Sequence, residues 1–277
     1  FAATGDAKYT DVVENCLYNS ILPGISLDGK KYFYTNPMRI SADLPYKLRW
    51  PKERTEYISC FCCPPNTLRT LCEAQDYAYS IGKNEIYVNL YGDNTLNTRI
   101  DGIGDIAISQ TTDYPWDGTV ELTIDKLKGK KEFGIRLRVP DWCTEGATIL
   151  VNGAQQTIEA AGTYATVTRT WKKGDVVTLS MPMRTRLIEA NPLVEESRGQ
   201  VAVQRGPIVY CLESNDLGGA RIDDIAIPLN AKFTPVDMTI DGSRVKALEA
   251  EVINRSEPSW KGQLYREAST GKQTVKV

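Results

Sequence analysis

The sequence predicts a mainly β protein that begins with a short helical part. Within the first 83 residues, apolar side chains recur at helical spacing, whereas from about residue 84 they alternate with polar side chains, as in a strand. Turn motifs separate the alternating runs, which is typical of an antiparallel sandwich. The chain has 277 residues, enough for two domains of roughly 100–150 residues each.

Two helices are predicted in the first part. The first spans residues 11–22 and ends at Pro23-Gly24, and the second spans residues 67–80 and starts at Asn66, a residue type that caps helices. In the first helix the following apolar residues share one face: Val12, Val13, Cys16, Leu17 and Ile21. In the second helix the following residues form the predicted buried stripe: Leu68, Leu71, Cys72 and Ala78.

Two β-sandwich domains are predicted after the helices. Residues 120–124 and 133–139 alternate apolar and polar side chains, and Asn152-Gly153 is a strong signal for a tight hairpin. A boundary near Asn191-Pro192 separates the first sandwich from a second one.

Composition excludes several partners and chemistries. The net charge is −2, so no basic field points to nucleic acid or to an anionic membrane. No apolar run approaches the roughly 20 residues that span a bilayer. Histidine is absent, which removes the commonest general base and zinc ligand. The chain starts without methionine or signal peptide, so we expect a fragment or a processed product.

Three of the seven cysteines crowd into the stretch Cys60-Phe-Cys-Cys-Pro-Pro-Asn66. A disulfide within it is disfavoured because the residues are too close in sequence to join without strain. A zinc site would use these thiolates as two or three of its four donors. A reactive thiol is equally reasonable, because a helix start lowers a thiol pKa. Packing of buried thiols is the plain alternative, and it is the one favoured for the four isolated cysteines: Cys16, Cys72, Cys143 and Cys211.

The stretch Cys62-Cys63-Pro64-Pro65-Asn66 resembles the signature of glycoside hydrolase family 127, the β-L-arabinofuranosidases. Further stretches of roughly residues 1–215 are similar to family landmarks in the same order: residues 9–19, 24–29, 33–38, 114–118, 138–142, 151–153, 171–175 and 205–210. The resemblance implies an (α/α)6 barrel followed by two antiparallel β-sandwich domains. Residues 1–83 would then be the C-terminal remnant of the barrel, 84–190 the first sandwich and 191–277 the second.

The resemblance also implies a chemistry. Cys62 matches the nucleophile of a retaining glycosidase, Cys63 matches a zinc ligand, and Cys62 would also touch the Zn²⁺. Tyr34 matches a tyrosine that lines the sugar site. The acid/base glutamate and the other zinc ligands would precede Phe1, so this chain alone is expected to be inactive. The implied substrate is a plant oligosaccharide or polysaccharide, and a periplasmic or extracellular bacterial location is favoured.

Other polar and aromatic residues receive plainer interpretations. Surface or helix-cap roles are expected for the carboxylates near the barrel remnant, which are Glu14, Glu56, Glu73 and Asp76. Arg136 and Arg138 are expected to form a solvated strand face, and Trp116, Trp142 and Trp171 to be core or interface residues. The rival hypotheses are a non-catalytic carbohydrate-binding or accessory unit and a purely structural zinc site. The barrel-facing side of residues 1–83 is expected to be covered by the missing segment or by a second copy of the chain.

Overall fold

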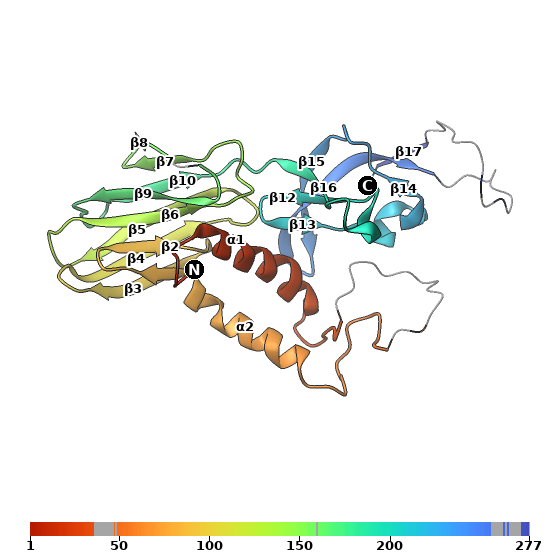
Figure 1. The fold of residues 1–277 in the computed structure, drawn as a ribbon, viewed down its shortest axis with the longest axis horizontal. Coiled ribbons are helices and arrows are strands. Elements are labelled where there is room, and N and C mark those ends of the chain that lie inside the picture. The colour runs from red at the N-terminus through yellow and green to blue at the C-terminus, as the bar shows by residue number, and fades with distance from the viewer. Residues whose placement is uncertain are drawn as a thin grey trace. The chain divides into compact units, whose positions relative to one another are not determined.

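The structure is a computed structural model that describes residues 1–35, 47, 49–158, 160–255, 263, 265 and 273–276 (Figure 1). The chain divides into two compact units. The first contains residues 1–183 and 206–208, and the second contains residues 184–205 and 209–277. Both are rich in strands, so the prediction of a mainly β protein with few helices is confirmed.

The first unit begins with two helices, α1 (Ala7–Cys16) and α2 (Cys63–Tyr77). A π-helical turn, η1 (Leu17–Ile21), and a 3-10 turn, η2 (Leu22–Gly24), extend α1. The strands of this unit are β1 (Tyr79–Ile81), β2 (Glu85–Val88), β3 (Asn94–Ile100), β4 (Gly104–Thr112), β5 (Thr119–Leu127), β6 (Phe133–Val139), β7 (Thr148–Val151), β8 (Ala154–Gln156), β9 (Thr163–Arg169) and β10 (Val176–Ser180).

These strands form a sandwich of a four-stranded sheet, β1-β2-β6-β9, and a six-stranded sheet, β3-β4-β5-β10-β7-β8. The apolar residues of β5 and β6 are buried in the core, as their alternation predicted. Asn152 and Gly153 take positive φ angles of 49° and 80° between the paired strands β7 and β8, which confirms the tight hairpin. The sandwich is not purely antiparallel, because β2 pairs with β6 in parallel.

The second unit is also built from β-sheets. One sheet has the order β11-β12-β13, and in the other β16 pairs with β14, β15 and β17. Its strands are β11 (Thr185–Glu189), β12 (Val201–Arg205), β13 (Ile208–Tyr210), β14 (Ile225–Ala226), β15 (Phe233–Ile240), β16 (Ser243–Asn254) and β17 (Gln273–Lys276).

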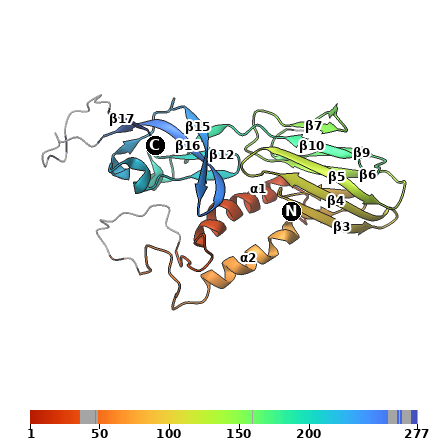
Figure 2. The ribbon, with the colours of Figure 1, turned by 180° about the vertical axis from the view of Figure 1, so that it is seen from behind.

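Helix α1 buries its polar side rather than its apolar one. Its buried residues are Ala7, Thr10, Asp11 and Glu14, whereas Val12 is 60% exposed. The residues of the predicted apolar face are exposed or only partly buried in this chain. Helices α1 and α2 run side by side in both views (Figures 1 and 2).

Helix α2 starts earlier than predicted and is more exposed. It begins at Cys63, with Pro64 and Pro65 in its first turn, so Asn66 lies inside the helix and is not its cap. Proline suits the first turn because the N–H groups there have no partner within the helix. The predicted buried stripe is wrong for this chain, since none of the fifteen residues of α2, all described, is fully buried.

Within the described residues, no helix is both long and apolar enough to span a bilayer. The division of the chain into residues 1–83, 84–190 and 191–277 stays a prediction.

Candidate functional site

The three crowded cysteines lie together at the start of α2. Cys62 occupies the position just before the first helical residue, Cys63. The Sγ of Cys62 lies 3.7 Å from the Sγ of Cys60 and 3.4 Å from that of Cys63. All seven cysteines are in the described part of the chain and none forms a disulfide. The sequence is thus right that these thiols meet at a helix start.

Tyr34, the predicted sugar-site residue, lies against the same thiols. The Cys60 thiol donates a weak hydrogen bond to the Tyr34 hydroxyl at 3.8 Å. The Tyr34 ring stacks on Trp50 with a centroid distance of 3.8 Å. Trp50 was not predicted as a site residue, because no local motif in the sequence marks it. Residues 36–38 of the stretch that includes Tyr34 lie outside the described residues.

The two adjacent thiols, Cys62 and Cys63, differ in the direction in which their surroundings shift the pKa. A hydrogen bond from Tyr34, and then those with Cys63 and Cys60, hold the pKa of Cys62 below its ordinary value. Burial, and then the contact with Cys62, raise the pKa of Cys63. Cys62 is therefore the thiol that ionises more readily, which is the property a nucleophile needs.

The sulfur spacing fits part of a zinc site. Zinc–sulfur bonds of about 2.3 Å in tetrahedral geometry place two sulfurs roughly 3.8 Å apart. The separations of 3.4 and 3.7 Å around Cys62 are close to that value. However, among the residues that the structure describes, no three His, Cys, Asp or Glu side chains are grouped so that they could hold a metal ion. These residues therefore suit a partial donor set, and further ligands are needed.

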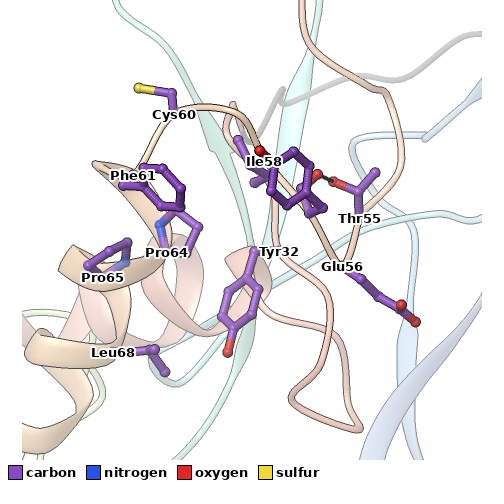
Figure 3. A pocket seen from close by; sticks show the side chains of 10 residues that line it. Tyr32, Thr55, Glu56, Ile58, Cys60, Phe61, Pro64, Pro65 and Leu68 are labelled. Atoms are coloured by element: carbon purple, nitrogen blue, oxygen red, sulfur yellow. Dashed lines mark hydrogen bonds between the residues drawn. The ribbon is translucent and has the colours of Figure 1, made fainter.

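A hollow of about 190 Å³ opens beside the cluster (Figure 3). Phe61, Pro64 and Leu68 line it from the helix side, and the ring of Tyr32 lies between them and the Thr55–Ile58 stretch. Glu56 is also among its lining residues. Flat rings with a few polar groups are suited to holding a ligand with an apolar face, such as a sugar ring.

A second cluster of functional groups lies under α1 and centres on Arg138. The Arg138 side chain is fully buried, donating from Nη1 to Asp11 Oδ1 at 2.6 Å and from Nη2 to Glu14 Oε1 at 2.5 Å. Its Nε donates to the carbonyl oxygen of Asn89 at 2.6 Å. The predictions that Arg138 is solvated and that Glu14 has a surface or cap role are both wrong. Arg136 is only partly exposed and pairs with Glu85.

Glu14 is also bonded from the core of the sandwich. The Tyr114 hydroxyl donates to its Oε1 at 2.6 Å, and the indole N–H of Trp142 donates to its Oε2 at 3.3 Å. Each carboxylate oxygen of Glu14 therefore has a donor, as a buried carboxylate requires. With both carboxyl groups ionised, the cluster would contain two negative charges and one positive charge.

Burial of the cluster and its excess of negative charge both raise the pKa of Asp11. Burial, together with the nearby carboxylates of Asp141 and Glu14, raises the pKa of Asp11 to about 6 despite the contact with Arg138. Although burial opposes its charge, Glu14 and neighbouring tyrosines raise the pKa of Arg138 further above its ordinary value. The guanidinium thus stays charged, and the Asp11 carboxyl titrates at a higher pH than an ordinary aspartate.

Asp11→Asn is expected to remove a pH-dependent loss of stability. Because the folded-state pKa of Asp11 lies above the ordinary value of an aspartate, folding takes up a proton, so stability falls as pH rises from about 4 to about 6. The asparagine variant should lack this fall, which we expect to be on the order of 1–2 kcal/mol. Urea denaturation at pH 4, 5, 6 and 8 measures the difference between parent and variant. If the free energy of unfolding changed with pH in the same way in the parent and the variant, the raised pKa would not belong to Asp11.

The remaining predicted residues have mixed outcomes. Trp142 and Trp171 are buried, as expected, and Cys143 is a buried thiol. The cysteines Cys16, Cys72 and Cys211 are exposed, against the prediction. Glu56 and Asp76 are exposed, and Glu73 is half-buried and accepts a hydrogen bond from Tyr77, which agrees with surface roles.

Comparison with known proteins finds similarity to glycoside hydrolase family 127 over almost the whole chain. Three family models match in succession: the catalytic domain of GH127 β-L-arabinofuranosidases at residues 1–76, their middle domain at 85–183, and the family 127 C-terminal domain at 185–259. A non-reducing end β-L-arabinofuranosidase from Bifidobacterium longum subsp. longum is 32% identical over 223 residues, which are 76% of this chain and 33% of that protein.

Solved structures agree with the sequence matches. A structure described as a glycoside hydrolase is 58% identical, with a TM-score of 0.94 over 99% of this chain and 45% of its own. A GH127 β-L-arabinofuranosidase from Geobacillus stearothermophilus T6 is 36% identical, with a TM-score of 0.87 over 99% of this chain and 43% of its own. The chain therefore spans a third of the curated relative and less than half of these solved chains. From its order of matching domains and its fold, the chain belongs to glycoside hydrolase family 127.

Proposed function

We propose that this chain is the C-terminal part of a retaining, zinc-dependent glycoside hydrolase that cleaves β-L-arabinofuranosides or a related plant-polysaccharide sugar. The observation that carries the proposal is the group of three thiols at the start of α2, within a stretch matched by the GH127 catalytic-domain model. Residues 1–83 are the end of an (α/α)6 barrel, followed by sandwiches at 84–190 and 191–277. The rest of the barrel is supplied by sequence before Phe1.

In the proposed reaction, the Cys62 thiolate attacks the anomeric carbon and forms a carbon–sulfur bond as the glycosidic bond breaks. The leaving oxygen takes a proton from a carboxylic acid of the missing barrel segment. Water, deprotonated by the same group, then breaks the carbon–sulfur bond, so the configuration at the anomeric carbon is retained. Tyr34 lines the sugar site and donates to the ionised sulfur, which orients it.

Cys62 and Cys63 are the residues of this chain that would hold zinc. When bound, the ion supplies a positive charge that keeps a coordinating thiol ionised near neutral pH. A metal with thiolate ligands also hinders pairing of those thiols, which suits an enzyme outside the reducing cytosol.

The full-length protein should hydrolyse a chromogenic β-L-arabinofuranoside and not its α anomer, because the nucleophile approaches from one face only. Metal analysis of the same preparation should find about one zinc per chain, from the four-donor site proposed. Release of product by a chelator-treated sample should fall and recover when zinc is added. Zinc-loaded protein that binds arabinose oligosaccharides but turns over neither anomer would instead support an accessory carbohydrate-binding unit.

A further inference from the structure

Several contacts join the two helices of the first unit to the sandwich, and the buried group around Arg138 is one that serves both helices. Helix α1 is bound there through Asp11 and Glu14, both of which accept from Arg138. The end of α2 is bound through Asn89, whose N–H donates to the carbonyl oxygen of Ala78 at 2.9 Å. The carbonyl oxygen of the same Asn89 accepts from Arg138. One guanidinium thus links the attachment of both helices.

Further contacts join the segment that follows α1 to the segment that leads into the thiol cluster. At the end of η2, the Pro23 carbonyl oxygen accepts two hydrogen bonds from the Arg54 guanidinium, at 3.0 and 2.6 Å. Backbone bridges join Tyr32 to both Ile25 and Thr55. These contacts therefore attach the segment that leads to Cys60 to the turn that follows α1. Helix α2 contains Cys63 in its own first turn. A shift of either helix on the sandwich moves the cluster.

We propose that Arg138 is a positioning residue for the thiol cluster, acting from the face of the sheet under α1 by fixing the two helices between which the cluster is held. The catalytic part of this inference rests on the proposed function of Cys62. Arg138 touches no reacting atom. It acts through α1 by Asp11 and Glu14, and through α2 by Asn89.

The shape of the guanidinium explains why arginine is required. Three of its nitrogens donate in three directions, to a backbone carbonyl and to two carboxylates. A lysine ammonium keeps the charge but presents it at one point, so it cannot hold all three acceptors in the same geometry. Arg136 provides a matched comparison, since it lies two residues away on β6 and pairs with Glu85 at a partly exposed site.

The test compares Arg138→Lys with Arg136→Lys in the full-length protein, with Glu14→Gln as a second, milder change at the cluster. For each folded variant, kcat and KM are measured on a chromogenic β-L-arabinofuranoside, and hydrogen exchange is followed in peptides covering residues 54–66. We expect Arg138→Lys to lower kcat about 10- to 100-fold with KM within about twofold, because small displacements of a nucleophile are costly. Exchange at residues 54–66 should accelerate about tenfold in the same variant and stay at the parent rate in Arg136→Lys.

Glu14→Gln should change both readouts in the same direction by less, so the test stands even where Arg138→Lys does not fold. Equal kcat in Arg138→Lys and Arg136→Lys, or slower turnover with unchanged exchange at residues 54–66, would overturn the proposal. The role of Cys62 as nucleophile and the role of Arg138 in positioning are tested by different results. Full activity in Cys62→Ser would remove the proposed nucleophile, whereas faster exchange at residues 54–66 in Arg138→Lys would still support positioning of the cluster.

Discussion

Replacing Cys62 with serine in the full-length protein is expected to lower kcat for a β-L-arabinofuranoside by at least roughly a thousandfold. A thiolate is a strong nucleophile near neutral pH, whereas a serine hydroxyl stays protonated unless a base activates it. No histidine exists in this chain to do so, and Tyr34 is itself a weak acid that donates to the sulfur. Steady-state kinetics with product analysis measures the loss.

The neighbouring cysteines make this prediction specific. Cys60→Ser keeps both Cys62 and Cys63, and we expect it to cost about tenfold or less, because only a thiol–thiol and a thiol–hydroxyl contact are weakened. Cys72→Ser changes an exposed thiol further along α2 and should leave kcat unchanged. A Cys62→Ser enzyme as active as Cys72→Ser would exclude Cys62 as the nucleophile.

The sandwich of the first unit could be predicted from sequence because its signals are local. At residues 120–124 of β5 and along β6 every second residue is apolar and lies in the core, so periodicity predicts directly which side chains face inward. The hairpin at Asn152-Gly153 needs two consecutive positive φ angles, which these residue types adopt at little cost. The same turn chemistry at Asp241-Gly242, between β15 and β16, was overlooked although the signal is present.

The buried faces of the helices were harder to predict, because the residues that pack against them are distant in sequence. The polar face of α1 is buried against partners that are distant in sequence, among them Arg138, which lies 124 residues beyond Glu14 and donates to it. A local hydrophobic pattern cannot show such a pairing, so the burial of the polar face of α1 could not be predicted from it. The exposed Val12 on α1 and Leu68 on α2 are apolar side chains that the proposed remainder of the barrel would cover.

The thiol cluster was predictable as a group, but its roles were not. Three cysteines within four residues must lie close together, and the prolines after them favour a helix start. The roles could not be predicted because the hydrogen bond that lowers the pKa of Cys62 comes from Tyr34, in a loop that precedes the cluster by almost 30 residues. Trp50, which stacks on Tyr34, belongs to the same loop and could be placed only by the structure.

Arg138→Met is expected to lower the free energy of unfolding by about 3–5 kcal/mol. The change removes the cation from two buried carboxylates and the donor from the Asn89 carbonyl oxygen, while it keeps most of the side-chain volume. Urea denaturation of the first unit at pH 7 measures the loss. Arg136→Met is the control on the same strand, and since its pair with Glu85 is partly exposed, it should cost within about 1 kcal/mol.

The cause of the loss can be separated from packing by neutralising the partners. Adding Asp11→Asn and Glu14→Gln to Arg138→Met removes the uncompensated charges, so the triple variant should be more stable than the single one by at least about 2 kcal/mol. Tyr114 and Trp142 can still donate to the amide oxygen at position 14, although its amide group gives them one acceptor fewer than a carboxylate. If the triple variant were no more stable than Arg138→Met, lost packing and the orphaned carbonyl would account for the effect. Buried charge would then have no part in holding α1 to the sandwich.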